Sequence, residues 1–428
     1  MKKIVWLFPG QGSQYVGMGK KLAEQFHAVR EVFEEANDVM GFDLKRLCFE
    51  GSMDELTRTE NTQPAILTVS VAACRVYMQE IGIEPYYCAG HSLGEISALT
   101  CAYAIEFHDA LKIVRRRGEL MKEAAAAGLG SMAAVSGIDK AELQKICDRY
   151  TFRENVAVIS NYNSPDQTVI SGHKAAIYEI NEHLQGLGAK VVPLKVSAPF
   201  HSPLMQKAAD KFEMELAGYK FGDLKYPVIS NTNALPYEGK ASIASLLKAQ
   251  ITRPVQWVES MEYLRQHEME IAVELGPGTV LRNLMSKNTP GIKTFSFDKE
   301  DDTEELKKVL SENQISFENQ IKRFEHTVVT KCIAVAVCTR NRNWNYDEYL
   351  RGVIEPYKKV QKRQEELEKE GIQPTLFDMQ EALDMLSSVF VTKKVPVKEC
   401  IERFNEVFHE TGTRHLFPDF KMQYKDEL

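Results

Sequence analysis

Residues 86–104 read YYCAGHSLGEISALTCAYA and combine a strand, a turn and a helix in one continuous pattern. The apolar strand Tyr86–Ala89 runs into a turn with the pattern G-x-S-x-G, and a helix-compatible segment, Glu95–Ala104, follows. Such a turn places the serine hydroxyl, here that of Ser92, at a helix N-terminus, where backbone N–H groups stabilise negative charge. We therefore expect Ser92 to be a nucleophile. The alternative is a Gly-Ser turn that only caps a helix.

The same alternation of strands and helices occupies residues 1–128 and resumes over residues 198–297. Further predicted strands are Ile4–Phe8, Val228–Asn231 and Ile271–Leu275, and helical patterns lie near Met18–Phe33 and Ala65–Met78. Strands separated by helices indicate a mostly parallel sheet that binds ligands at the carboxyl ends of its strands. The sequence therefore predicts an α/β fold, with an α/β-hydrolase-like catalytic domain built from these two segments.

Residues 129–197 show the pattern of a compact insert. The predicted strands are Ser131–Gly137, Val156–Asn161, Gln167–Ser171 and Val191–Val196, and the predicted helices are Lys140–Tyr150 and Lys174–Leu187. The order βαββαβ is the ferredoxin-like arrangement. We expect a ferredoxin-like subdomain inserted into the larger domain.

Residues 298–428 differ from the rest because helical patterns, such as Tyr346–Lys369 and Met379–Val389, replace the strands. We predict a mostly α-helical extension of unknown role. It is a candidate docking module for a carrier protein or a synthase. Alternatively, it wraps the catalytic domain for stability or carries an unrelated activity. Its cysteine and histidine pairs lack the spacing of metal ligands.

The composition excludes several classes of protein. Among 428 residues, 44% are hydrophobic and the net charge is -7, which argues against nucleic acid as a partner. No apolar run approaches the ~18 residues of a membrane helix. The 8 cysteines form no C-x-x-C motif, as is typical of a reducing cytoplasm. Lys425–Leu428 matches a retention signal of the endoplasmic reticulum, but Met1–Gly10 lacks a signal-peptide pattern, so we expect coincidence and a cytoplasmic location.

A serine nucleophile needs a base within hydrogen-bonding distance. His91 adjoins Ser92, but neighbouring side chains on a turn usually point apart. His201 follows a predicted strand at the end of the insert, where a loop can return to the functional edge of the sheet. His201 is therefore the candidate base, and a structural histidine is the alternative.

Two further segments are candidate binding elements. The glycine-rich turn Phe8–Gln14 lacks the full pattern of a phosphate-binding loop, but it can supply a backbone N–H to an oxyanion. Arg115, Arg116 and Arg117 are consecutive on a predicted helix and cannot share one face. An arginine that points inward would bind a carboxylate in a bidentate manner, whereas a solvated face is the simpler interpretation.

Eight sequence blocks between residues 1 and 297 together resemble the malonyl-CoA:acyl-carrier-protein transacylases. This family includes stand-alone enzymes of fatty-acid synthesis and free-standing acyltransferases that serve modular polyketide synthases. In chain order the blocks are Phe8–Gln14, Thr62–Ala65, Gly90–Glu95, Arg117–Met121, Asn161–Pro165, Phe200–Ser202, Pro254–Trp257 and Glu274–Gly278.

The resemblance implies a role for individual residues in catalysis. Ser92 would be the nucleophile and His201 its general base. The backbone N–H groups of Gln11 and Leu93 would form the oxyanion hole. The main-chain carbonyl of Gln250 would orient the histidine, in agreement with the lack of a clear acidic residue for a triad.

The resemblance also implies how the substrate is bound. Arg117 would pair with the free carboxylate of the malonyl group, and Gln63 would line the pocket. Phe200 resembles the residue of malonyl-selective members, where an aromatic ring narrows the pocket beside the acyl α-carbon. An ordinary core phenylalanine is the alternative interpretation.

These residues imply transfer of a malonyl group from malonyl-CoA to the phosphopantetheine thiol of an acyl-carrier protein through an acyl-enzyme at Ser92. No metal or redox cofactor, nucleic acid or membrane is expected to take part. The length of the extension favours polyketide over fatty-acid synthesis and makes a polyketide synthase a candidate partner. Two alternatives are a proofreading acyl hydrolase that uses Ser92 and His201, and an assembly-line docking protein with a vestigial site.

Overall fold

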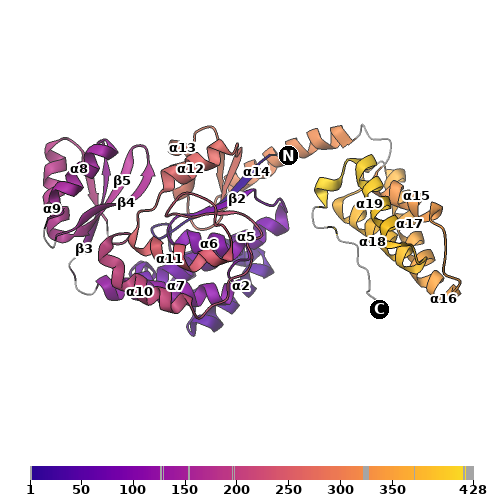
Figure 1. Cartoon of the computed structure of the whole chain (residues 1–428), viewed down its shortest axis with the longest axis horizontal. Coiled ribbons are helices and arrows are strands. Elements are labelled where there is room, and N and C mark those ends of the chain that lie inside the picture. Colours follow the sequence, from indigo (N-terminus) through magenta and orange to yellow (C-terminus); the bar gives the residue numbers. More distant parts are fainter. Residues whose placement is uncertain are drawn as a thin grey trace. The chain divides into compact units, whose positions relative to one another are not determined.

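The computed structural model describes residues 2–125, 128, 130–152, 155–194, 196, 198–321, 327–370, 372–417 and 420 (Figure 1). The tetrapeptide Lys425–Leu428 lies outside the described residues. The chain forms two compact units, residues 1–309 and residues 310–428, and the division falls within helix α14 (Glu300–Ile321). Each unit is described by itself.

A five-stranded parallel sheet forms the centre of the first unit, with the strand order β7-β2-β1-β8-β9. The strands are β1 (Ile4–Phe8), β2 (Tyr87–Gly90), β7 (Val228–Ile229), β8 (Ile271–Glu274) and β9 (Lys293–Ser296). Every residue of β1 and β8 is buried. Continuous apolar runs are expected where helices cover both faces of a parallel sheet. The prediction of an α/β fold with a parallel sheet is confirmed.

Helices surround this sheet. They are α1 (Lys20–Gln25), α2 (His27–Met40), α3 (Leu44–Glu50), α4 (Met53–Thr57), α5 (Thr59–Glu80), α6 (Leu93–Cys101), α7 (Phe107–Ala125), α10 (Gln206–Leu216), α11 (Ile243–Thr252), α12 (Trp257–Gln266) and α13 (Val280–Asn288), with short turns η1 (Pro203–Met205) and η2 (Lys240–Ser242). Helix α5 is buried along most of its length and packs against α2, α6 and α7. It is therefore a central element of the core, unlike an amphipathic surface helix.

Residues 130–193 form a second, antiparallel sheet with two helices. The elements follow the order β3 (Gly130–Ser136), α8 (Lys140–Tyr150), β4 (Ala157–Ser164), β5 (Gln167–His173), α9 (Lys174–Gly186) and β6 (Lys190–Pro193). The strand order in the sheet is β4-β5-β3-β6, and α8 and α9 pack together beside it (Figure 1). Strand β4 also contacts the larger part of the unit, because Val255 exchanges backbone hydrogen bonds with Ser160 and Tyr162.

All the secondary-structure elements in the described residues of the second unit are helices. Its elements are α15 (Val328–Cys338), α16 (Tyr346–Tyr349), the π-helix η3 (Leu350–Ile354), α17 (Glu355–Glu370), α18 (Leu376–Thr392), α19 (Val397–Thr411) and the turn η4 (Arg414–Leu416). Capping boxes begin α15 at Thr327 and α18 at Thr375. A core of apolar side chains from α15, α18 and α19 holds these helices together.

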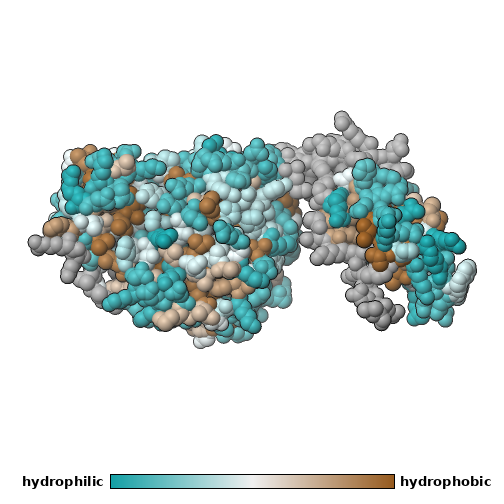
Figure 2. All heavy atoms as spheres, viewed as in Figure 1, coloured by the Kyte–Doolittle hydropathy of each residue, from teal (hydrophilic) through white to brown (hydrophobic). Residues whose placement is uncertain are grey.

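The visible face of each unit is largely hydrophilic, with hydrophobic residues scattered among the polar ones (Figure 2). The larger apolar side chains gather in buried clusters. None of the helices in the described residues combines the length and apolar character needed to span a membrane.

Candidate active site

Ser92 lies at the sharp turn between β2 and α6, with backbone angles φ 52° and ψ -107°. A positive φ is costly for a residue with a side chain, so the surrounding structure must hold it in place. The two glycines of the motif are required by close packing. A Cβ on Gly90 would lie 1.9 Å from the carbonyl oxygen of Gly94, and a Cβ on Gly94 would lie 2.0 Å from that of Phe8.

The side chain of Asn231, just after β7, holds this turn. Its Oδ1 accepts a hydrogen bond from the backbone N–H of Ser92, and its Nδ2 donates to the carbonyl of Gly90, both at 2.7 Å. The backbone N–H of Ser92 is therefore not available to a substrate. Asn231 was not predicted as a site residue, although its place at the end of a predicted strand is a signal that could have indicated one.

His201 is within hydrogen-bonding distance of Ser92, although the two residues are 109 positions apart. Ser92 Oγ and His201 Nε2 are 2.8 Å apart, and His201 Nδ1 is 2.7 Å from the main-chain oxygen of Gln250. Because a carbonyl oxygen only accepts, Nδ1 carries the proton and Nε2 is free to accept the proton of the serine hydroxyl. The structure thus brings together Ser92, His201 and the main-chain carbonyl of Gln250.

His201 is buried, and its surroundings keep it neutral. Burial, followed by the nearby positive charge of Arg117, lowers the pKa of His201 from its ordinary value to about 3. The hydrogen bond to Gln250 opposes this shift. The imidazole is therefore neutral at ordinary pH, the form in which it can accept a proton.

His91, the other histidine considered from the sequence, points elsewhere. Its Nε2 is 2.9 Å from Oδ1 of Asn163, and its ring packs against Trp257. Burial lowers the pKa of His91. His91 therefore links the turn to strand β4 and does not contact the hydroxyl of Ser92.

Arg117 is the inward-pointing member of the three consecutive arginines and is only 2% exposed. Its Nη1 donates to Oε1 of Gln63 at 2.9 Å, and its Nη2 donates to Ser92 Oγ at 3.2 Å and to Oε1 of Gln250 at 2.8 Å. Burial lowers the pKa of Arg117 to about 10, so the group stays charged at neutral pH. Arg115 and Arg116 instead form ion pairs with Glu119.

The buried charge of Arg117 is incompletely compensated. The hydrogen-bond partners found for it in the described part of the chain are all neutral oxygens, and its Nε–H has none. A buried cation without a contacting anion is costly, and binding of an anion would relieve that cost. The arrangement therefore favours a negatively charged group beside Ser92.

The predicted oxyanion donors are the backbone N–H groups of Gln11 and Leu93. The chain segment next to Gln11 packs closely against the turn that precedes Leu93. Gln11 follows β1 and Leu93 begins α6, and a Cβ on Gly10 would lie 2.3 Å from the carbonyl oxygen of His91. Among the described residues, neither N–H donates a hydrogen bond to a protein group. Both therefore remain available to a substrate oxygen.

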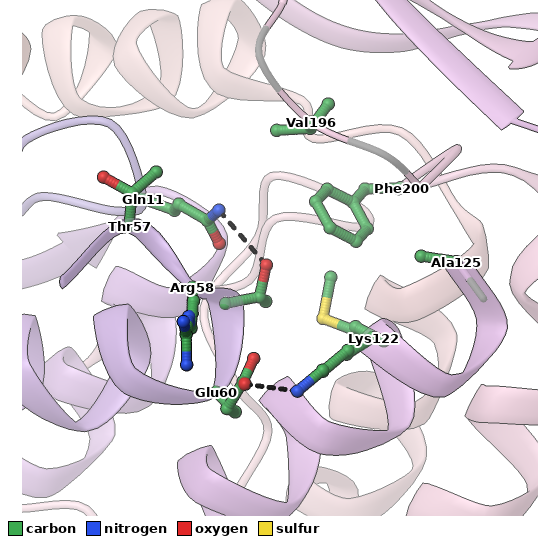
Figure 3. A pocket seen from close by; sticks show the side chains of 10 residues that line it. Gln11, Thr57, Arg58, Glu60, Lys122, Ala125, Val196 and Phe200 are labelled. Atoms are coloured by element: carbon green, nitrogen blue, oxygen red, sulfur yellow. Dashed lines mark hydrogen bonds and ion pairs between the residues drawn. The ribbon is translucent and has the colours of Figure 1, made fainter. Parts of the chain in front are cut away.

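A cavity of about 190 Å³ adjoins these residues (Figure 3). It is lined by Gln11, Thr57, Arg58, Thr59, Glu60, Met121, Lys122, Ala125, Val196 and Phe200. The Phe200 ring lies across the pocket from Gln11, whose side chain donates to Thr59. Met121 connects the cavity to the site because its sulfur accepts a hydrogen bond from Gln63. Phe200 is thus a pocket-lining residue as well as a largely buried one.

Sequence reasoning missed Glu95, the residue that follows the G-x-S-x-G motif. Its side chain is fully buried and accepts hydrogen bonds from the Gln250 side chain and from Tyr237. No group of three or more possible metal ligands occurs in the part of the chain that the structure describes.

Comparisons with known proteins identify the family of this chain. The model of the acyl transferase domain matches residues 5–318. A malonyl CoA-acyl carrier protein transacylase of Bacillus subtilis is 38% identical over 399 residues, which cover 93% of this chain and 98% of that protein. The protein of the same name from Escherichia coli K12 is 43% identical over 288 residues, which cover 67% of this chain and 93% of that protein.

Solved structures give the same result. The transacylase of Coxiella burnetii has a TM-score of 0.68 at 37% identity and covers 70% of this chain and 94% of its own. A malonyl-transacylase in complex with a type II polyketide acyl-carrier protein has a TM-score of 0.67 at 38% identity, covering 69% and 96%. The chain therefore carries an acyl transferase domain. It belongs to the family of the malonyl CoA-acyl carrier protein transacylases.

The comparisons also bear on the second unit. The Bacillus subtilis alignment of 399 residues is longer than the first unit, residues 1–309, so it continues into the second. The Escherichia coli protein is 93% covered by only 288 residues and has no room for a second unit of this size. The extension is thus shared with one relative and absent from another.

Proposed function

We propose that this protein transfers malonyl groups from malonyl-CoA to the phosphopantetheine thiol of an acyl-carrier protein through an acyl-enzyme at Ser92. The observation that carries the proposal is the position of Ser92 Oγ, 2.8 Å from His201 Nε2 and 3.2 Å from the buried guanidinium of Arg117. The nucleophilic oxygen of Ser92 therefore contacts both its base and the cation that would bind the free carboxylate.

In the first half-reaction, His201 Nε2 takes the proton of Ser92 while Oγ attacks the thioester carbonyl of malonyl-CoA. The N–H groups of Gln11 and Leu93 stabilise the resulting oxyanion. The carbon–sulfur bond then breaks, and His201 returns the proton to the departing sulfur, which leaves as the thiol of coenzyme A. The product is a malonyl ester on Ser92.

The second half-reaction reverses these steps with a different thiol. His201 takes the proton of the phosphopantetheine thiol, and the sulfur attacks the ester carbonyl. The same two N–H groups hold the oxyanion. When the carbon–oxygen bond breaks, His201 returns the proton to Ser92, and the malonyl group leaves on the carrier protein. The protein groups alone account for every proton in this cycle.

Arg117 and Phe200 would set the choice of acyl group. A bidentate pair between Arg117 and the malonyl carboxylate supplies the missing anion and favours malonyl over uncharged acyl groups. The Phe200 ring limits the space beside the α-carbon. The role of Arg117 argues against a proofreading hydrolase, because such an enzyme releases plain acyl chains.

We propose the following domain assignment. Residues 1–128 and 198–297 form the α/β-hydrolase-like catalytic domain, and the βαββαβ order supports a ferredoxin-like insert at 129–197. Residues 298–428 form the helical extension. Its docking to a polyketide synthase is a prediction, supported by its separate core and by its absence from the Escherichia coli relative.

Intact-protein mass spectrometry after mixing with malonyl-, methylmalonyl- and acetyl-CoA tests the function. We expect the mass of the wild-type chain to increase by one malonyl group, and Ser92→Ala to remain unmodified because it lacks the nucleophile. Subsequent addition of a phosphopantetheinylated carrier protein should remove the adduct. A wild-type chain that takes up no malonyl group, or a Ser92→Ala variant that does, would contradict the proposal.

A further inference from the structure

Glu95 is a buried carboxylate that the mechanism above does not use. It lies in the first turn of α6, close after Ser92, and is fully buried. Its Oε1 accepts a hydrogen bond from the hydroxyl of Tyr237 at 2.5 Å. Its Oε2 accepts from the Gln250 side chain at 2.5 Å and from the backbone N–H of Asn231 at 3.2 Å. All these partners are donors, which is the arrangement that suits an ionised carboxylate.

The Gln250 side chain connects Glu95 to Arg117. Its Nε2 donates to Glu95 and also to the main-chain oxygen of Ser92 at 2.9 Å, while its Oε1 accepts from Arg117 at 2.8 Å. A flipped amide would point its NH2 group at the guanidinium and its oxygen at a carboxylate. The orientation of this amide is therefore fixed by charges at both ends.

The chain of contacts forms an ion pair bridged by an amide. The negative charge of Glu95 strengthens the N–H donor side of the Gln250 amide, and the same polarisation makes its oxygen a better acceptor for Arg117. Burial raises the pKa of Glu95, and the hydrogen bonds from Tyr237, Gln250 and Asn231 act in the opposite direction. The direct hydrogen-bond partners of the Arg117 guanidinium are neutral, and Glu95 is the anion that one bridging amide, that of Gln250, connects to it.

We infer that Glu95 is a positioning residue for acyl-group choice: through the Gln250 amide it holds Arg117 in the position that receives the substrate carboxylate. The inference rests on the proposed function, because it assumes that Arg117 binds the malonyl carboxylate. Acetyl loading needs Ser92 and His201 but has no carboxylate for Arg117. Loss of the Glu95 charge should therefore affect malonyl loading selectively.

The test compares rates of adduct formation on Ser92 from malonyl-CoA and acetyl-CoA in single turnovers. Glu95→Gln keeps the size of the side chain and removes its charge. We expect the ratio of malonyl to acetyl loading to fall about 10-fold, since a charge-assisted hydrogen bond becomes a neutral one. Gln250→Met should lower the ratio similarly, because it removes the bridging amide but keeps the main-chain carbonyl that orients His201.

A double variant tests the route of the effect. In the Gln250→Met background, Glu95→Gln should leave the ratio unchanged, because the amide that transmits its influence is gone. Tyr237→Phe is the matched control: it removes a hydrogen bond to the other oxygen of Glu95 and should leave the ratio within about 3-fold of the wild type.

Three outcomes would overturn the inference. The first is that both single variants lose malonyl and acetyl loading equally. The second is that Glu95→Gln lowers the ratio of malonyl to acetyl loading in the Gln250→Met background as much as it does alone. The third is that Tyr237→Phe lowers this ratio as much as Glu95→Gln does. Failure of the proposed function would be seen separately, because the wild-type chain would then form no malonyl adduct.

Discussion

At the scale of single residues, the candidate base His201 is oriented by a peptide carbonyl instead of a carboxylate. His201 donates its Nδ1–H to the main-chain oxygen of Gln250, and the charge with the largest effect on its pKa is the positive charge of Arg117. A carboxylate in that place would raise the pKa of the imidazole, whereas burial and Arg117 lower it to about 3. This difference determines how the site responds to pH.

We expect the rate of malonyl loading to change less than about 3-fold between pH 7 and pH 5, because His201 stays neutral in this range. A histidine with the ordinary pKa near 6.5 would be about 97% protonated at pH 5 and would lose about 25-fold in rate between pH 7 and pH 5. Single-turnover loading followed by mass spectrometry at several pH values measures the effect. A decline that follows a pKa near 6.5 would contradict the expectation.

The same pKa shift has a consequence for stability. Because the folded-state pKa of His201 lies below that of the unfolded chain, the unfolded chain binds the extra proton. The contribution of His201 to the free energy of unfolding is therefore fully present above about pH 6.5 and is lost as the pH falls toward 3. In denaturant titrations, His201→Gln should lose less stability between pH 7 and pH 5 than the wild type. Parallel losses would contradict this assignment.

Arg117 is predicted to act on malonyl groups and not on acyl groups in general. Arg117→Ala should slow malonyl loading about 100-fold or more, as expected when one partner of a buried ion pair is removed, and should slow acetyl loading far less. Arg116→Ala is the matched control, since Arg116 is a neighbour that pairs with Glu119 and Glu123 away from Ser92. Equal losses for the two acyl groups in Arg117→Ala would disprove the carboxylate pair.

At the scale of elements, the turn between β2 and α6 depends on the strand beside it. The side chain of Asn231, which follows β7, accepts a hydrogen bond from the N–H of Ser92 and donates one to the carbonyl of Gly90. The backbone N–H of Asn231 in turn donates a hydrogen bond to Glu95. The two segments are 139 positions apart and become neighbours because β2 and β7 pair in the sheet. The position of the nucleophile is thus a property of two adjacent strands.

Asn231→Ala should slow malonyl and acetyl loading by similar factors, about 10- to 100-fold. The variant leaves a buried N–H and a buried carbonyl without partners, at about 1–3 kcal/mol each, and frees the strained turn. Asn233→Ala, at an exposed position two residues further on, is the control. Loading rates and thermal midpoints should be measured together. A variant with an unchanged loading rate would show that the turn holds its shape without this side chain.

The elements that could be predicted from the sequence are those with a local signal. The strand Ile4–Phe8 and the helix Lys140–Tyr150 were predicted with the observed bounds, and the turn at Ser92 was recognised from its glycines. The match of the acyltransferase family is confirmed. Helix α5 begins before the predicted segment Ala65–Met78. Its first turns are polar but buried, and hydrophobic periodicity does not reveal buried polar residues.

The candidate site could be predicted only in part, for a physical reason. Ser92 has a local motif, and the position of His201 after a predicted strand makes it the candidate base, whereas the roles of Gln250 and Arg117 come from the family resemblance. Neither the motif nor the resemblance assigns a role to Glu95, although it ends the block Gly90–Glu95, or to Asn231, which ends a predicted strand. Their functions depend on hydrogen bonds across more than a hundred positions, and such contacts exist only once the sheet has brought its strands together.

At the scale of the whole molecule, the predicted catalytic residues all lie in the first unit, residues 1–309. The second unit has its own core, and a relative of the same name does without a comparable extension. Acyl loading and the function of the extension should therefore be separable by experiment.

A chain that ends after Ile321, which retains helix α14, should load malonyl groups within about 3-fold of the full-length rate, because it keeps every site residue and a complete sheet. Ser92→Ala in the shortened chain is the control. A loss of more than 10-fold with an unchanged thermal midpoint would show that the extension contributes to the site. Slower transfer to the carrier protein with unchanged loading would support docking, and equal transfer would contradict it.

The double use of Gln250 has a practical consequence for redesign. Its backbone oxygen governs proton movement, and no substitution at this position removes that atom. Its side chain, by contrast, accepts a hydrogen bond from Arg117, the residue that we propose binds the free carboxylate of the acyl group. Position 250 is therefore a place where extender-unit preference can be retuned by mutagenesis while the proton-transfer step is left intact.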